Sequence, residues 1–334
     1  MKKSMFMKIY IIPIILISPI MMFSSNSWFS IWMIMELNLM SFIPFIIFYN
    51  KFYKELSIKY FIIQAISSSI LIFFSNLMFL NFLYNFKLMF IFMINFSLLI
   101  KLGTPPFHNW FINMMNNMNW LNCLILSTWQ KIIPMISLMY IYNKYLIYFT
   151  SMLSSFLSAL YGLNHQSIRI IISYSSINHL SWMLMNLMIS ELTWLYYFNS
   201  YMIINLSIML ILNKLNIMYI NQFFSMKSNY KINLFIIFNF FSISGLPPMF
   251  GFSMKWISIN YLNLNMIQTF LIFMIILSTL TFMFYMRICT NLMLNFKLTN
   301  KMILSNKYIN YNTPKILLIF SSFINLWIMS IWIY

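Results

Sequence analysis

Long apolar runs separated by short polar joints occupy almost the whole of this 334-residue chain. Each run is close to the length of about 20 residues that an α-helix needs to cross the apolar part of a bilayer. The pattern differs from the alternating ten-residue segments of a membrane β-barrel. It predicts an all-α polytopic membrane protein with about 11 transmembrane helices. We expect the helices near 5–24, 27–49, 57–81, 87–117, 120–142, 145–163, 167–189, 192–213, 232–261, 264–288 and 316–334.

Two of the apolar runs contain Gly and Pro residues that interrupt a helix. The first reads SLLIKLGTPPFHNW at 97–110, and the second reads SGLPPMFGFSMKW at 244–256. Proline removes a backbone donor and clashes with the preceding turn, so both helices should break. Broken backbone at membrane depth persists only where protein or an internal water path covers it. The breaks are expected at Gly103, Pro105, Pro106, Gly245, Pro247 and Pro248.

The two broken helices, 87–117 and 232–261, predict an internal repeat. Each is fourth in a group of five helices, and because five is odd the second group enters the membrane from the opposite side. This is an inverted-topology repeat, in which paired broken helices indicate an ion site. The predicted units are 1–142 and 143–288, followed by a joint and a closing helix at 289–334.

Charge is scarce and unevenly placed. The chain is 62% hydrophobic and 7% charged, whereas soluble chains are about a quarter charged, so no separate soluble domain is expected. With eleven alternating helices, fifteen of the 20 Lys and Arg residues fall on one side and only Lys87 and Lys144 on the other. This asymmetry predicts an N-terminus in the matrix or cytoplasm. The net charge of +17 then indicates contact with anionic lipids such as cardiolipin and excludes a need for nucleic acid.

Amino-acid usage favours an animal mitochondrial gene. Val and Asp are absent and Met occurs 33 times, as expected for an A+T-rich genome with an additional Met codon; an A+T-rich bacterium is the alternative. Cys123 and Cys289 are too few for an iron–sulfur or zinc site. A Gly-rich phosphate loop and a paired-His haem motif are also missing from the sequence. We expect no cofactor and no redox chemistry in this chain.

Four ionisable residues lie inside predicted helices: Glu36, Lys101, Lys131 and Lys255. Each costs about 2.5–3.5 kcal/mol at the centre of a bilayer unless it is paired or hydrated. Burial disfavours the charged form of a carboxyl or an amine, and attraction between Glu36 and Lys101 opposes that effect. Such groups can relay protons through water. The alternative is that the lysine side chains snorkel to the membrane surface.

Two histidines are further candidates for the relay. His108 follows the first break and His179 lies mid-helix in SSINHLSWML. Either imidazole could bridge lysines in a neutral or protonated form, or serve as a hydrogen-bonded packing residue.

Five segments together resemble a known family: SNSWFSIWMIMELNLMSFIP, LLIKLGTPPFHNWF, TWQKIIPM, SSINHLSWML and SGLPPMFGFSMKW. They are similar to the chain 2 family of mitochondrial NADH–ubiquinone oxidoreductase, an antiporter-like subunit of respiratory complex I. The similarity runs from about Ser24 to Arg287. It implies a fourteen-helix pattern reduced to eleven by loss of the first three. It also implies a protein of the inner mitochondrial membrane whose N-terminus lies in the matrix.

The resemblance also implies roles. Glu36 and Lys101 correspond to the glutamate and partner lysine of the first unit, Lys131 to the central lysine and Lys255 to the terminal lysine of the second unit. His108 and His179 correspond to positions on the hydrated axis. Other subunits would oxidise NADH and reduce quinone, and the other membrane-arm subunits would be the partners. This chain would couple that reaction to proton translocation.

Two rival interpretations remain at this point. One is an Mrp-type cation/proton antiporter subunit, which should exchange Na⁺ for H⁺ in liposomes. The other is a structural membrane subunit with an inactive channel, for which Lys131→Ala should assemble and leave pumping unchanged.

Overall fold

The computed structural model describes residues 2–49, 53–79, 86–225, 230–247, 249–264 and 268–299. Within these residues the elements are helices, accompanied by a single β-bridge between Ser167 and Tyr219. The chain divides between Leu153 and Ser154 into two compact units. Several sequence predictions fall outside the described residues: Pro248, the closing helix at 316–334, and Lys51, Lys227, Lys301, Lys307 and Lys315.

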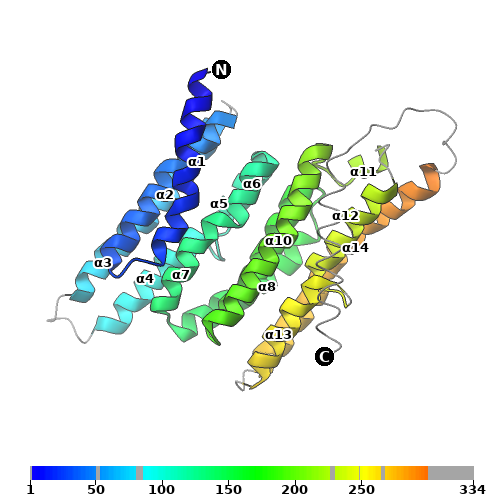
Figure 1. Ribbon diagram of the computed structural model, residues 1–334. Helices are drawn as coiled ribbons and strands as arrows, with labels where there is room; N and C mark the ends of the chain where they lie inside the picture. The colour runs from blue at the N-terminus through cyan, green and yellow to red at the C-terminus, as the bar shows by residue number, and fades with distance from the viewer. Residues whose placement is uncertain are drawn as a thin grey trace. The chain divides into compact units, whose positions relative to one another are not determined.

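The first unit consists of helices that pack side by side (Figure 1). Helix α2 packs against α1 and α3, α3 packs against α4, and α4 packs against α7. The elements are α1 (Lys2–Met22), α2 (Trp28–Tyr49), α3 (Lys54–Phe79), α4 (Lys87–Leu102), α5 (Asn109–Asn117), α6 (Trp120–Ser127), the 3₁₀ turn η3 (Trp129–Lys131), α7 (Ile132–Tyr140) and the first half of α8 (Lys144–Gly162).

The second unit is built around α9 (Ile168–Leu187). Every residue of α9 except Ile170 is buried, and the helix contacts α10, α13 and α14. The other elements are α10 (Glu191–Leu215), α11 (Gln222–Ser225), α12 (Tyr230–Ser244), α13 (Phe250–Leu264) and α14 (Gln268–Thr299).

Five helices of the described part are long and apolar enough to cross a membrane by length and composition. They contain the segments Trp28–Ile47, Lys54–Met78, Trp120–Tyr140, Glu191–Leu215 and Gln268–Leu294. The polar α9 is not among them. Its Ser, Asn and His side chains face other helices, so its average hydropathy does not reflect its surroundings.

The helix predicted at 120–142 is present as the apolar span Trp120–Tyr140, but its backbone is interrupted between α6 and α7. Pro134 has no N–H to bond the carbonyl of Gln130, and its ring clashes with that carbonyl in a regular helix. Thr128 donates its hydroxyl to the Leu124 carbonyl at 2.6 Å, and residues 129–131 form a 3₁₀ turn. The chain therefore has a break at Lys131 that the sequence analysis did not predict.

Helix α14 is longer than predicted. It continues through the first part of the joint expected from residue 289 and ends at Thr299. The reason is packing: Ile288, Cys289 and Leu292 are at most 1% exposed, so the buried face of the helix continues past the predicted end.

One hydrogen bond fixes η3 to α1. Pro19 cannot donate to the carbonyl of Ile15, which would otherwise lack its helical partner. The indole N–H of Trp129 donates to this carbonyl at 2.7 Å, and the Ser18 hydroxyl donates to it at 3.1 Å. A proline in one helix thus creates the acceptor that holds the break in another.

Candidate functional site

The first predicted break is a glycine-terminated helix end. Gly103 follows α4 with φ +70°, the left-handed conformation that favours glycine. The Gly103 N–H donates to the Ile100 carbonyl at 3.1 Å and the Thr104 N–H donates to the Leu99 carbonyl at 3.2 Å. A Cβ at Gly103 would lie 2.9 Å from that of Phe111, so α5 packs closely against the break.

The second predicted break repeats this geometry. Gly245 follows α12 with φ +79°, and its N–H donates to the Ser242 carbonyl at 3.1 Å. The Leu246 N–H reaches back to the Phe241 carbonyl at 3.3 Å, the same five-residue spacing as Thr104 to Leu99. Both helices, α4 and α12, therefore end in the same type of turn.

Lys101 lies in the last turn of α4 and is 8% exposed. Its ammonium group donates to the Met35 sulfur at 3.2 Å. Glu36, the next residue of α2, is half-buried and acts on Lys101 electrostatically, without supplying that hydrogen bond. The negative end of the α4 dipole also favours a cation here. The expected partner is thus nearby, with Met35 as the contacting residue.

Lys131 ends the 3₁₀ turn and is 2% exposed. Its ammonium group lies 4.8 Å from the centre of the Phe111 ring, a cation–π contact. Because the side chain extends into the interior of the first unit, the structure disagrees with a lysine that snorkels to the membrane surface.

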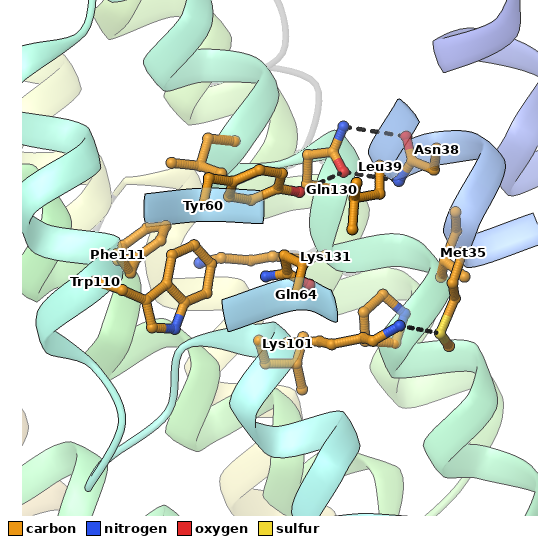
Figure 2. A pocket seen from close by; sticks show the side chains of 14 residues that line it. Met35, Asn38, Leu39, Tyr60, Gln64, Lys101, Trp110, Phe111, Gln130 and Lys131 are labelled. Carbon is orange, nitrogen blue, oxygen red and sulfur yellow. Dashed lines mark hydrogen bonds between the residues drawn. The ribbon is translucent and has the colours of Figure 1, made fainter. Parts of the chain in front are cut away.

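Lys101 and Lys131 line one cavity of about 30 Å³. Figure 2 shows the two ammonium groups pointing in opposite directions, Lys101 toward Met35 and Lys131 toward Trp110 and Phe111. One buried water needs about 10–15 Å³ of such space, so the cavity has room for about two. The polar residues of its lining are Asn38, Tyr60, Gln64, Lys101, Gln130 and Lys131.

Lys255 belongs to the second unit and is 6% exposed. Its ammonium group donates at 2.7 Å to the carbonyl of Ser244, the last residue of α12. A Cβ at Gly245 would lie 2.9 Å from the Lys255 Cδ atom, so the glycine leaves the space that this side chain occupies. Lys101 and Lys255 share one feature: each lies at the negative end of the half-helix that precedes a break.

The two candidate histidines occupy different environments. His108 precedes α5, is half-buried, and lies outside the cavity, with Nδ1 3.3 Å from the Pro106 carbonyl. His179 is buried within α9, and its Nδ1 lies 2.9 Å from the Tyr197 hydroxyl. Its ring also packs against Tyr201, with ring centres 5.1 Å apart.

Comparison with known sequences places the chain in a family. The family model described as NADH:quinone oxidoreductase/Mrp antiporter, TM, matches residues 25–281. NADH-ubiquinone oxidoreductase chain 2 of Anopheles gambiae is 41% identical over 310 residues, 89% of each chain. The same protein of Aedes aegypti is 43% identical over 306 residues, 88% of each chain. The chain belongs to the NADH-ubiquinone oxidoreductase chain 2 family.

Solved structures show the fold of this chain 2 family member. A chain of respiratory complex I from Thermus thermophilus matches with a TM-score of 0.73 and 16% identity, over 80% of this chain and 66% of that one. A chain of the membrane-bound sulfane sulfur reductase, an archaeal respiratory membrane complex, matches with a TM-score of 0.82 and 16% identity, over 96% and 72%. The fold is the antiporter-like membrane fold.

Sequence reasoning for this chain 2 family member missed the amides at the cavity. The side chains of Asn38 and Gln130 exchange two hydrogen bonds, of 2.7 and 3.1 Å. The Tyr60 hydroxyl approaches the Gln130 Oε1 atom at 3.5 Å. Asn38 follows Glu36 by two residues, and Gln130 directly precedes Lys131. The sequence could have indicated both amides, because each is a polar residue beside a charged residue in an apolar run.

Proposed function

We propose that this chain is a core membrane-arm subunit of respiratory complex I that relays protons across the inner mitochondrial membrane. The observation that carries the proposal is the shared cavity of Lys101 and Lys131. Two buried lysines that line one cavity with room for about two waters can exchange protons when their ammonium groups turn toward it, whereas two dry lysines cannot. Glu36 would bias the first lysine electrostatically, and Lys255 would act in the second unit.

The proposed topology has eleven membrane spans in two inverted five-helix repeats, with the N-terminus in the matrix. The matching hydrogen-bond patterns at Gly103 and Gly245 support the repeat. The uneven distribution of Lys and Arg supports the orientation. The proposed units remain 1–142 and 143–288, with 289–334 as a closing segment.

The proposed partners are the other membrane-arm subunits and anionic lipids. NADH oxidation and quinone reduction would take place in other subunits, and their free energy would drive proton movement here. We propose no cofactor in this chain, because its two cysteines, Cys123 and Cys289, are too few to hold an iron–sulfur cluster or a zinc site.

The test uses the assembled complex with Lys131→Ala or Glu36→Gln. We expect assembly on a native gel and a loss of proton-coupled turnover of about a hundredfold or more, because a general acid–base group typically contributes about 10²–10⁴-fold. NADH–quinone activity and proton uptake are measured together. Lys144→Ala is the matched control, because that lysine is exposed at the start of α8.

Full coupled activity in both variants would contradict the relay and favour a structural subunit. An Mrp-type antiporter is the second candidate, because the matching family model includes Mrp antiporters. Exchange of Na⁺ for H⁺ by the purified chain in liposomes would favour it over the relay within complex I.

A further inference from the structure

Two buried amides connect the helix of Glu36 to the break at Lys131. Asn38 Nδ2 donates to Gln130 Oε1 at 2.7 Å, and Gln130 Nε2 donates to Asn38 Oδ1 at 3.1 Å. Asn38 is 5% exposed and Gln130 is 9% exposed. The two residues are 92 positions apart in the chain. A reciprocal pair of this kind fixes both the distance and the orientation of its members, because moving either side chain breaks two bonds.

The pair lies at the edge of the cavity that contains both lysines (Figure 2). One short stretch of α2 therefore contacts Lys101 and the residue that precedes Lys131. Met35 accepts a hydrogen bond from Lys101, Glu36 acts on Lys101 electrostatically, and Asn38 holds the residue that precedes Lys131. A displacement of this stretch would therefore change the surroundings of Lys101 and the position of Lys131.

The break at Lys131 needs such a contact. A 3₁₀ turn has poorer hydrogen-bond geometry than an α-helix, and Pro134 denies the Gln130 carbonyl its usual donor. The backbone alone therefore fixes the direction of Lys131 weakly. An amide pair suits this role because amides do not ionise, so the contact persists whichever neighbouring groups carry a proton.

We propose that the Asn38–Gln130 pair is a positioning clamp, which holds Lys131 at the cavity and couples its position to the Glu36 segment of α2. The proposal rests on the proposed relay and adds two residues that act through Lys131. Neither amide is required to transfer a proton.

The test compares Asn38→Leu and Gln130→Met in the assembled complex. Each removes the pair from one side while roughly conserving volume. A misplacement of about 1 Å can cost up to about a hundredfold in a transfer step. We therefore expect about a tenfold loss in the rate of proton-coupled turnover, with assembly retained and a shifted pH profile. Asn122→Leu is the matched control: Asn122 is a buried amide of α6 whose side-chain atoms make no hydrogen bond to the described part of the chain.

The double variant Asn38→Gln with Gln130→Asn tests rescue. It exchanges the two side-chain lengths and retains the pair, so it should recover most of the proton translocation. It also decides the outcome if a single variant does not assemble: an assembled and coupled double variant supports the clamp, and an uncoupled one overturns it.

Two further results would overturn the clamp. One is normal proton translocation in both single variants while Lys131→Ala is impaired; this leaves the proposed function intact. The other is an equal loss in Asn122→Leu, which would indicate general sensitivity to changes in buried amides. Normal translocation in Lys131→Ala itself would instead contradict the proposed function.

Discussion

At the scale of single residues, opposing effects act on the ammonium groups of Lys101 and Lys255. Removal from water disfavours the charged form. The negative ends of α4 and α12 favour it, and Lys255 also bonds the last carbonyl of α12 at 2.7 Å. A lysine in such a place can hold a proton without a permanent carboxylate partner. This balance is what a residue that must both accept and release a proton requires.

Gly245→Ala should displace Lys255 and impair proton translocation. The new Cβ would approach the Lys255 Cδ atom at 2.9 Å, and φ +79° would add about 1–2 kcal/mol of strain for an L-residue. We expect an assembled complex with a several-fold loss in the rate of proton-coupled turnover, measured in proteoliposomes. Gly162→Ala is the control, because its Cβ would meet Phe284 at 2.9 Å without touching a lysine. Equal effects in the two variants would argue against a specific role for Gly245.

At the scale of elements, the site is made by helix ends. Gly103 and Gly245 end their helices with the same type of turn. The interruption at 129–131 places a third lysine, Lys131, in the interior of the first unit. Each break requires a neighbouring group to satisfy or cover its backbone. The interaction of Trp129 with Ile15 is the clearest case, since Pro19 leaves that carbonyl without a helical donor.

Trp129→Phe should destabilise the first unit. It removes the indole donor and leaves Ser18 as the donor to the Ile15 carbonyl, so a loss of about 1 kcal/mol is expected. The measurement is survival of the membrane arm on native gels after graded heating. Adding Pro19→Ala restores a helical N–H and should recover part of the loss. Failure of that second change to help would contradict the orphan carbonyl as the cause.

The breaks also show what the sequence could predict. Gly-x-Pro-Pro at 103–106 and 245–248 is a local signal, and the described parts of both helices end where it indicated. Pro134 is a local signal as well, but it disrupts the turn that precedes it. Because it lies in a long apolar run, the sequence analysis predicted an unbroken helix there. The end of α14 depended on burial of Cys289 and Leu292, which only packing determines.

At the scale of the whole molecule, the candidate site is formed by contacts between distant parts of the chain. The Lys101–Met35 and Asn38–Gln130 contacts join residues 66 and 92 positions apart. A single sequence identified Glu36, Lys101 and Lys131 as candidates from their depth in apolar runs. It could not identify Met35 or Asn38 as their neighbours, because the packing of the helices determines which side chains meet across them.

The orientation of the chain can be tested with cysteine labelling in the assembled complex. Lys144→Cys should react with a membrane-impermeant maleimide from the intermembrane side, and Lys214→Cys from the matrix side; both lysines are exposed in this chain. The native Cys123 and Cys289 are buried, so background labelling should be low. Labelling of both positions from one side would contradict the alternating topology.

The most direct measurement is a map of the complete complex at a resolution that shows individual waters. We expect about two ordered waters in the cavity that Lys101 and Lys131 line, forming part of a hydrogen-bonded connection between the two ammonium groups. A cavity closed by side chains, or a dry apolar gap between the two lysines, would contradict proton transfer along this path.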